Sequence, residues 1–186
     1  LHLCNKNMEK MDTIKNDSKA KDNLLLEVCM AAYYEGDSIK THYTIHKQKY
    51  DDSASQLCTV LARSFADIGD IIRGKDLYIR NKQEKDRLEN NFKDIFAKIY
   101  EKLKDSRAKE HYKKDKETGN YYQLREDWWT ANRETVWKAL TCEVGGGTYF
   151  RRTCGDEKTG TLTPSQCRCN GDQVPTYFDY VPQYLR

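Results

Sequence analysis

His42 and His46 are the side chains whose type and spacing come closest to those of a metal site. Two histidines four residues apart share one face of a helix and could hold a zinc ion between them. Zinc proteases carry a glutamate directly after the first histidine, however, and this chain has Tyr43 there. We therefore predict that the two histidines lie on an exposed helix face and bind no metal.

Two other groups of residues could support catalysis, and each has a simpler explanation. The glycines at 145–147 follow a predicted helix, whereas a phosphate-binding loop follows a strand and ends in Lys-Ser or Lys-Thr, so they indicate a flexible linker. Asp67, Asp70 and Asp76 have no neighbouring nucleophile, which favours helix capping or the ordering of a loop. Because no catalytic arrangement is recognisable, we expect a protein that is not an enzyme and uses no cofactor.

Cysteine is unusually frequent, with seven copies among 186 residues. None belongs to a C-x-x-C pair of the kind that binds structural zinc, so disulfides formed in an oxidising compartment are the favoured interpretation. A metal site at Cys154, Cys167 and Cys169 is the alternative. Because seven is odd, at least one cysteine is free or paired outside the chain, and Cys4 is the candidate for an upstream partner. The cysteines are Cys4, Cys29, Cys58, Cys142, Cys154, Cys167 and Cys169.

The elements that must position these residues are helices, because apolar side chains recur with helical spacing over most of the first 142 residues. Asp22 or Asn23 can cap a first helix that ends at Gly36, and Asp37 can cap a second one that ends at Tyr50. The other predicted elements are helices over 56–73, from about 84 to about 112 and over 124–142, a loop at 74–82 and a polar linker at 113–120.

The apolar faces of these helices predict a packed core. Gly69, in the middle of its helix, marks a place where two helices approach closely. Residues 143–175 show little periodicity and are rich in Gly, Thr and Cys, so an ordered segment of this length requires cross-links. We predict an all-α fold, a disulfide-stapled helical bundle with a long irregular Cys/Gly/Thr-rich loop. The predicted core contains Phe65, Ile68, Phe92, Ile95, Phe96, Ile99, Trp128 and Trp137.

Two disulfides are predicted from these elements. Cys29 and Cys142 occupy core-facing positions of long helices that should pack together, so we predict that they are bonded to each other. Cys58 should pair into the region 143–169, and we prefer Cys154 to Cys167 as its partner.

Charge is the last feature that could indicate a ligand. The chain has 32 basic and 29 acidic residues, a net charge of +3 that is too balanced to indicate nucleic acid. Residues 98–116, however, hold eight basic and four acidic side chains. These could form a solvated, salt-bridged helix face, or they could bind a sulfated polyanion. The candidate glycan-binding residues are Lys93, Lys98, Lys102, Lys104, Arg107, Lys109, Lys113 and Lys114, and a second basic patch comprises Arg73, Lys75, Arg80, Lys82, Lys85 and Arg87.

Five segments of the chain resemble one known family. Residues 61–78, LARSFADIGDIIRGKDLY, resemble the signature block of the Duffy-binding-like domains of the α class, which form the head of the variant erythrocyte membrane protein 1 adhesins of malaria parasites. The resemblance extends to LHLCNKNME at 1–9, LLLEVCMAAYYEG at 24–36, the Trp-Trp, Asn-Arg and VWKALTC pattern within 127–142, and YFDYVPQYLR at 177–186.

The resemblance implies a position in a larger protein and a function. It implies that residues 1–20 lead in from a preceding subdomain, 21–142 form the helical-bundle subdomain, 143–175 form a cystine-pinned loop, and 176–186 begin the next subdomain. It also implies an adhesion module in the extracellular part of a membrane protein on the infected erythrocyte. The implied partners are host-cell receptors, heparan-sulfate-type glycans, neighbouring domains of the same chain and host antibodies, without nucleic acid. A spacer subdomain that positions neighbouring receptor-binding domains is the alternative.

Overall fold

Helices make up nearly all the regular structure of the described residues. The computed structural model describes residues 20–50, 55–77, 82–145, 152, 154–155, 160–163, 165–170 and 174–186. No β-strand occurs in these ranges, which contain only two isolated bridges between single residues. The predicted all-α fold is therefore confirmed. The helices are α2 (Ala20–Tyr50), α3 (Ser55–Arg73), α4 (Lys82–Glu101), α5 (Ser106–His111), α6 (Lys113–Thr118) and α7 (Tyr122–Leu140), followed by the 3-10 turns η3 (Phe178–Tyr180) and η4 (Gln183–Leu185).

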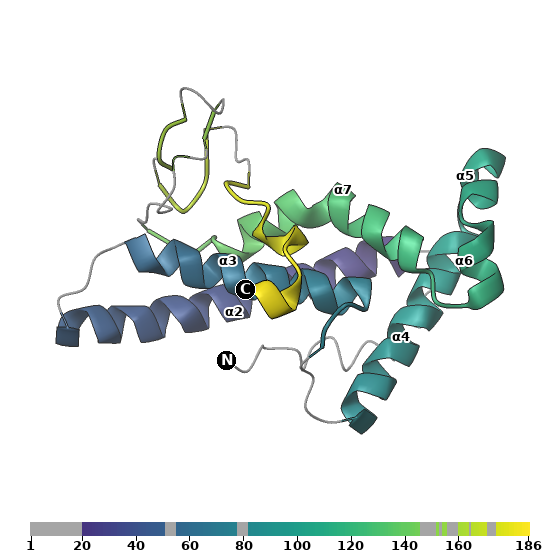
Figure 1. Ribbon diagram of the computed structural model, residues 1–186, viewed down its shortest axis with the longest axis horizontal. Helices are drawn as coiled ribbons and strands as arrows, with labels where there is room; N and C mark the ends of the chain where they lie inside the picture. The colour runs from purple at the N-terminus through teal and green to yellow at the C-terminus, as the bar shows by residue number, and fades with distance from the viewer. Residues whose placement is uncertain are drawn as a thin grey trace.

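Three long helices form the body of the bundle. Figure 1 shows α2 and α3 side by side with α7 packed along them, and α2 and α3 each contact α7. Helix α4 lies at one end of this body, and the short helices α5 and α6 lie beyond it. The first 3-10 turn, η3, packs on α3. None of the helices within the described ranges combines the length and the apolar character that a bilayer crossing requires.

Aromatic side chains from α3, α4 and α7 meet in the core. The ring of Phe65 lies 5.0 Å from that of Trp129 and 5.1 Å from that of Trp137, measured between centroids. Phe96 packs edge-on against Trp128 at 6.2 Å. All eight residues predicted for the core are buried, so that prediction is confirmed. Such tilted and edge-to-face pairs stabilise a core beyond the apolar area that they bury.

Two glycines allow helices to approach more closely than other residues would. A Cβ atom at Gly69 would lie 2.8 Å from the ring of Trp129, which confirms the predicted close contact. Gly36 was predicted to end a helix, and this is wrong, because α2 continues through it to Tyr50. A Cβ atom there would collide with the carbonyl oxygen of Leu140, so Gly36 serves the contact between α2 and α7.

The chain beyond α4 differs from the prediction of one helix followed by a linker. Helix α4 ends at Glu101, and after a break the side chain of Asp105 caps a new helix by accepting a hydrogen bond from the backbone N–H of Arg107 at 2.8 Å. The segment predicted as a polar linker contains α6, which ends where Gly119 adopts a φ of 68°. Polar composition concealed this helix because neither α5 nor α6 has a buried side chain.

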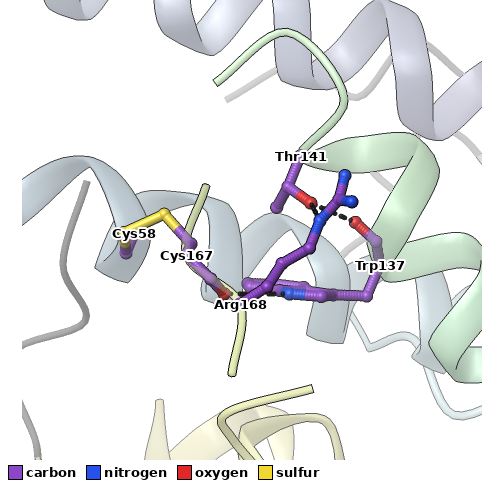
Figure 2. The surroundings of a disulfide bond; sticks show 5 residues. All are labelled: Cys58, Trp137, Thr141, Cys167 and Arg168. Carbon is purple, nitrogen blue, oxygen red and sulfur yellow. Dashed lines mark hydrogen bonds between the residues drawn. A yellow bond between two sulfur atoms is a disulfide. The ribbon is translucent and has the colours of Figure 1, made fainter. Parts of the chain in front are cut away.

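One disulfide ties the loop after α7 to the start of α3. Cys58 is bonded to Cys167, with 5.5 Å between their Cα atoms, so the predicted partner Cys154 is wrong although the predicted region is right. Figure 2 shows the reason. The indole N–H of Trp137 donates to the carbonyl oxygen of Cys167 at 3.1 Å, and the guanidinium of Arg168 donates to the hydroxyl of Thr141 at 2.7 Å. These bonds hold Cys167 against α7, within reach of α3.

The other cysteines of the described ranges do not follow the prediction either. Cys154 is bonded to Cys169, with 5.2 Å between Cα atoms, which replaces the alternative of a metal site with a second staple in the loop. Cys29 and Cys142 both carry free thiols, so the predicted bond between them is absent from the structure. Cys4 lies outside the described residues.

Candidate ligand-binding surface

The predicted glycan-binding residues extend from α4 into the segment that follows it, which we call the α5–α6 unit (residues 102–118). Lys93 and Lys98 flank the core side of α4 and are half-buried, whereas Lys102, Lys104 and Arg107 are exposed. The two predicted glycan-binding lysines on α4 are therefore less accessible to a ligand than the predicted residues that follow α4. The α4 side chains buried in the core are Leu88, Phe92, Ile95, Phe96, Ile99 and Tyr100.

The α5–α6 unit carries an excess of positive charge at the end of the bundle. Its 17 residues include seven basic and four acidic side chains, a difference of three that equals the net charge of the whole chain. Lys113 and Lys114 are exposed, and Lys109 is half-buried. Figure 1 shows that α5 projects beyond the ends of α4 and α7. Positive charge on a projecting element is accessible to a large anionic ligand.

Few of these charges are neutralised by ion pairs. Arg107 lies 3.7 Å from Asp105, and Lys113 lies 3.4 Å from Glu110, both on exposed side chains whose pairing contributes little free energy. Lys102, Lys104, Lys109 and Lys114 form no ion pair with another described residue. The pattern favours an accessible cationic surface over a closed salt-bridge network.

The unit is joined to the bundle by polar contacts and by the half-buried side chains of Leu103 and Tyr112, which pack against the core. The hydroxyl of Tyr100 donates to the carbonyl oxygen of Lys109 at 3.2 Å, and the hydroxyl of Tyr112 donates to the carboxylate of Asp127 at 2.8 Å. The carboxylate of Asp115 accepts the backbone N–H of Leu124 at 2.8 Å, which satisfies a free donor in the first turn of α7. Burial and the bond to Asp127 raise the pKa of Tyr112 to about 12.

Arg73 does not belong to the second predicted basic patch, because it is buried in the protein. Arg73 is buried with only 1% of its side chain exposed, and it pairs with Asp70 at 2.9 Å and Glu126 at 3.1 Å. Lys75 pairs with the same glutamate. Arg73 therefore cannot contact a ligand, because its guanidinium is buried and paired with carboxylates of the protein itself. Lys82, Lys85 and Arg87 are exposed along the start of α4, and Arg80 lies outside the described residues.

A buried charge cluster, which we call the C-terminal seam, joins η3 to α3 and α7. Asp179 is fully buried, and its carboxylate accepts two bonds from the guanidinium of Arg133, each 2.8 Å long, and one from the indole N–H of Trp129 at 2.9 Å. The backbone carbonyl of Asp179 accepts a bond from Arg73. Every oxygen of this buried carboxylate therefore has a charged or indole donor.

The seam extends to the last residue and explains the three aspartates of the signature block. Arg186 forms ion pairs with Asp67 and Asp70, and the side-chain amide of Gln183 donates to Asp76 at 2.7 Å. Burial raises the pKa of Asp67 and opposes its ionisation, whereas the charge of Arg186 favours it. These carboxylates hold the C-terminal segment in place and have no arrangement suited to acid–base catalysis. Sequence analysis missed the seam because its partners lie up to 119 residues apart.

The described residues offer little space for a small-molecule substrate. A cavity of about 20 Å³ lies between the end of α3 and the start of α4, which is room for about one water molecule. No group of three His, Cys, Asp or Glu side chains in the described ranges is arranged to hold a metal ion. His42 is exposed, and the side chain of His46 lies outside the described part.

Comparison with known proteins gives one matching family and several similar solved structures. The model of a family described as the Duffy binding domain matches residues 1–186. The chain is similar to the NTS-DBL1-alpha and CIDR-gamma double domain of the PfEMP1 protein of Plasmodium falciparum strain varO, with 41% identity, a TM-score of 0.81, and coverage of 99% of this chain and 25% of that chain. It is also similar to the NTS-DBL1(alpha-1) domain from the same strain, with 40% identity, a TM-score of 0.79, and coverage of 99% and 40%.

A third solved structure is the ICAM-1-binding PfEMP1 IT4var13 DBLbeta domain, with 34% identity, a TM-score of 0.72, and coverage of 100% of this chain and 39% of that chain. This chain thus spans well under half the length of the related structures, and comparison with curated proteins gives no match. Duffy binding domains of PfEMP1 are adhesion modules and not enzymes, which confirms the predicted class of function. The match over all residues, together with the shared helical fold, shows that the chain belongs to the Duffy binding domain family.

Proposed function

We propose that the chain is a host-cell adhesion module that binds sulfated, heparan-sulfate-type glycans through the α5–α6 unit and the end of α4. In this role it would act at the surface of the infected erythrocyte, within a larger membrane protein, and would support rosetting or attachment to endothelium. The observation that carries the proposal is the group of four lysines, Lys102, Lys104, Lys109 and Lys114, which have no ion-pair partner among the described residues.

The mechanism is electrostatic and follows from the position of these side chains. Exposed ammonium groups on a projecting unit keep their counterions until an anionic chain replaces them, and the release of those counterions favours binding. A sulfated glycan can contact several lysines at once because it carries many charges along its length. The affinity should therefore fall steeply as salt is added.

The test is retention of the protein on immobilised heparin, with the salt concentration at elution as the measurement. Changing Lys102, Lys104 and Lys114 together to Glu should abolish retention, because it reverses three exposed charges. The free energy of unfolding should change by less than about 1 kcal/mol, since exposed charges contribute little to folding.

A matched control carries the same change of net charge at another place. Lys40, Arg63 and Lys138 lie on α2, α3 and α7, outside the α5–α6 unit, and their replacement by Glu should leave most of the retention intact. Equal loss in both triple variants would mean that only net charge matters, and would contradict a localised site. Unchanged retention in the first variant would move the site to Lys82, Lys85 and Arg87 or outside the described residues.

A second candidate function is that of a spacer, and the C-terminal seam favours it. The seam holds residues 176–186 on α3 and α7 through the buried Asp179, so that a subdomain beginning there, as the family resemblance implies, would leave the bundle in a fixed direction. The spacer would be favoured if neither triple variant lost heparin retention and if receptor binding were confined to neighbouring domains.

A further inference from the structure

The α5–α6 unit is held on the bundle by a small set of contacts, because neither of its helices buries a residue, while the half-buried Leu103 and Tyr112 pack against the core. Two hydrogen bonds of 2.8 Å join the unit to α7: Asp115 accepts the backbone N–H of Leu124, and the hydroxyl of Tyr112 donates to Oδ2 of Asp127. Tyr112 stands at the junction of α5 and α6, where it serves as the C-cap of one helix and the N-cap of the other. A bond at this junction restrains both helices at once.

Asp127 is itself held in place on α7. Its other carboxylate oxygen accepts a bond from the side-chain amide of Gln123, one turn earlier, at 3.1 Å. The ring of His111, in the last turn of α5, lies 3.8 Å from the oxygen that binds Tyr112. The carboxylate therefore connects α5, the α5–α6 junction and α7, although 41% of its side chain is exposed.

We infer that Tyr112 and Asp127 are positioning residues for polyanion binding, which hold the lysines of the α5–α6 unit in one arrangement without contacting the ligand. The inference rests on the proposed function. A ligand that binds several charges of a restrained unit loses less conformational freedom than one that must first immobilise a mobile unit. Restraint of the unit should therefore raise the affinity, and its release should lower it.

The sign of one substitution separates this role from simple electrostatics. Asp127 is an anion beside a cationic surface, so its removal makes the local charge more positive. If only charge mattered, Asp127→Ala would bind heparin more tightly. If Asp127 positions the unit, the same variant binds more weakly in spite of the gain in charge.

The experiment compares two variants with matched controls on immobilised heparin and by hydrogen exchange of the free protein. Asp127→Ala and Tyr112→Phe should bind about two- to tenfold more weakly, the range set by the loss of one hydrogen bond. Asp94→Ala makes the same charge change at an exposed position of α4, and should bind as tightly as the wild type or more tightly. Tyr184→Phe removes a hydroxyl from an exposed ring of the C-terminal segment and should have no effect.

Hydrogen exchange supplies a measurement that does not depend on the ligand. In Asp127→Ala and Tyr112→Phe the amides of 106–118 should exchange faster, while the amides of α2 and α3 keep their protection. If the wild type is retained on heparin and Asp127→Ala is retained equally or more strongly, the positioning role is overturned and the proposed function stays intact. If the wild type elutes from heparin at the same salt concentration as the variant with Lys102, Lys104 and Lys114 changed to Glu, the proposed function is overturned, and the inference with it.

Discussion

The C-terminal seam and the α5–α6 unit both consist mainly of charged residues, but they use charge in opposite ways. In the seam, Asp179 and Arg73 are buried, and each is bonded to partners from another element. In the α5–α6 unit most of the charged side chains are exposed, and Lys102, Lys104 and Lys114 form no ion pair with a described residue. Burial makes an unpaired charge very unfavourable, whereas exposure leaves it available.

The difference shows why the number of basic residues in a segment does not identify a binding surface. Arg73 and Lys102 both lie in stretches rich in Lys and Arg, yet the first is an internal structural ion and the second is solvated. The distinction depends on partners that are remote in sequence, namely the carboxylate of Glu126 and the backbone carbonyl oxygen of Asp179. If burial determines this difference, substitutions in the seam should cost far more free energy of unfolding than substitutions in the α5–α6 unit.

The largest effect is expected in the seam. Asp179→Ala would leave the guanidinium of Arg133 and the indole N–H of Trp129 without their main partner, inside the protein. Removing one partner of a buried ion pair costs about 3–5 kcal/mol, and we expect a loss of this size in the free energy of unfolding measured in urea.

The exposed Asp94 is the control for this substitution. Its replacement by Ala should change the free energy of unfolding by less than about 0.5 kcal/mol. A loss below about 1 kcal/mol for Asp179→Ala would mean that the seam contributes no more than a surface ion pair, and the contrast between the two regions would disappear.

A smaller effect is expected at Gly69, which lies against the Trp129 ring of the seam. Gly69→Ala would press on the ring of Trp129, whose N–H bonds Asp179, so the ring would have to move away from its partner. Overpacking of this kind costs about 1–3 kcal/mol, measurable as a lower midpoint of urea unfolding. Gly145→Ala is the control, because no atom lies within 4 Å of the added Cβ. Equal midpoints for the two variants would contradict the close contact.

The smallest effect concerns ionisation in the α5–α6 unit. The pKa of Tyr112 is raised from 10.0 to about 12 by burial and by the bond to Asp127. Because the folded pKa lies above the unfolded one, the stabilising contribution of this phenol is complete below pH 10 and is lost as the pH rises toward 12. The difference in absorbance at 295 nm between wild type and Tyr112→Phe should therefore titrate near pH 12. A difference that titrates near pH 10 would show that the bond is not formed.

The sequence predicts the fold well where one helix face faces the core over several turns. The stripes through Phe65 and Phe96 predicted α3 and α4 because burial imposes a period of 3.6 residues on the apolar side chains. Gly69 was correctly predicted as a close contact. Gly36 was not, because a glycine that ends a helix and a glycine that admits a neighbouring helix look alike in sequence.

The sequence predicts the candidate site less well. The choice between Cys154 and Cys167 as the partner of Cys58 depends on hydrogen bonds from Trp137 and Arg168 that only the folded chain reveals. The two helices of the α5–α6 unit were not predicted as separate helices, because they have no buried side chains and therefore no periodic pattern of apolar residues. Family resemblance predicts the class of function but says nothing of which charges are free.

The bond between Cys58 and Cys167 also determines how the protein bears mechanical load, which an adhesion module meets when cells are pulled apart in flow. The two cysteines are 109 residues apart, so a pull on the chain that crosses both of them passes through the covalent bond and bypasses everything in between. Without the bond, that stretch could lengthen by about 360–390 Å when fully extended. Tension that neighbouring domains apply between α2 and the C-terminal segment therefore bypasses helices α4 to α7, and reaches the lysines of the α5–α6 unit only through a bound ligand.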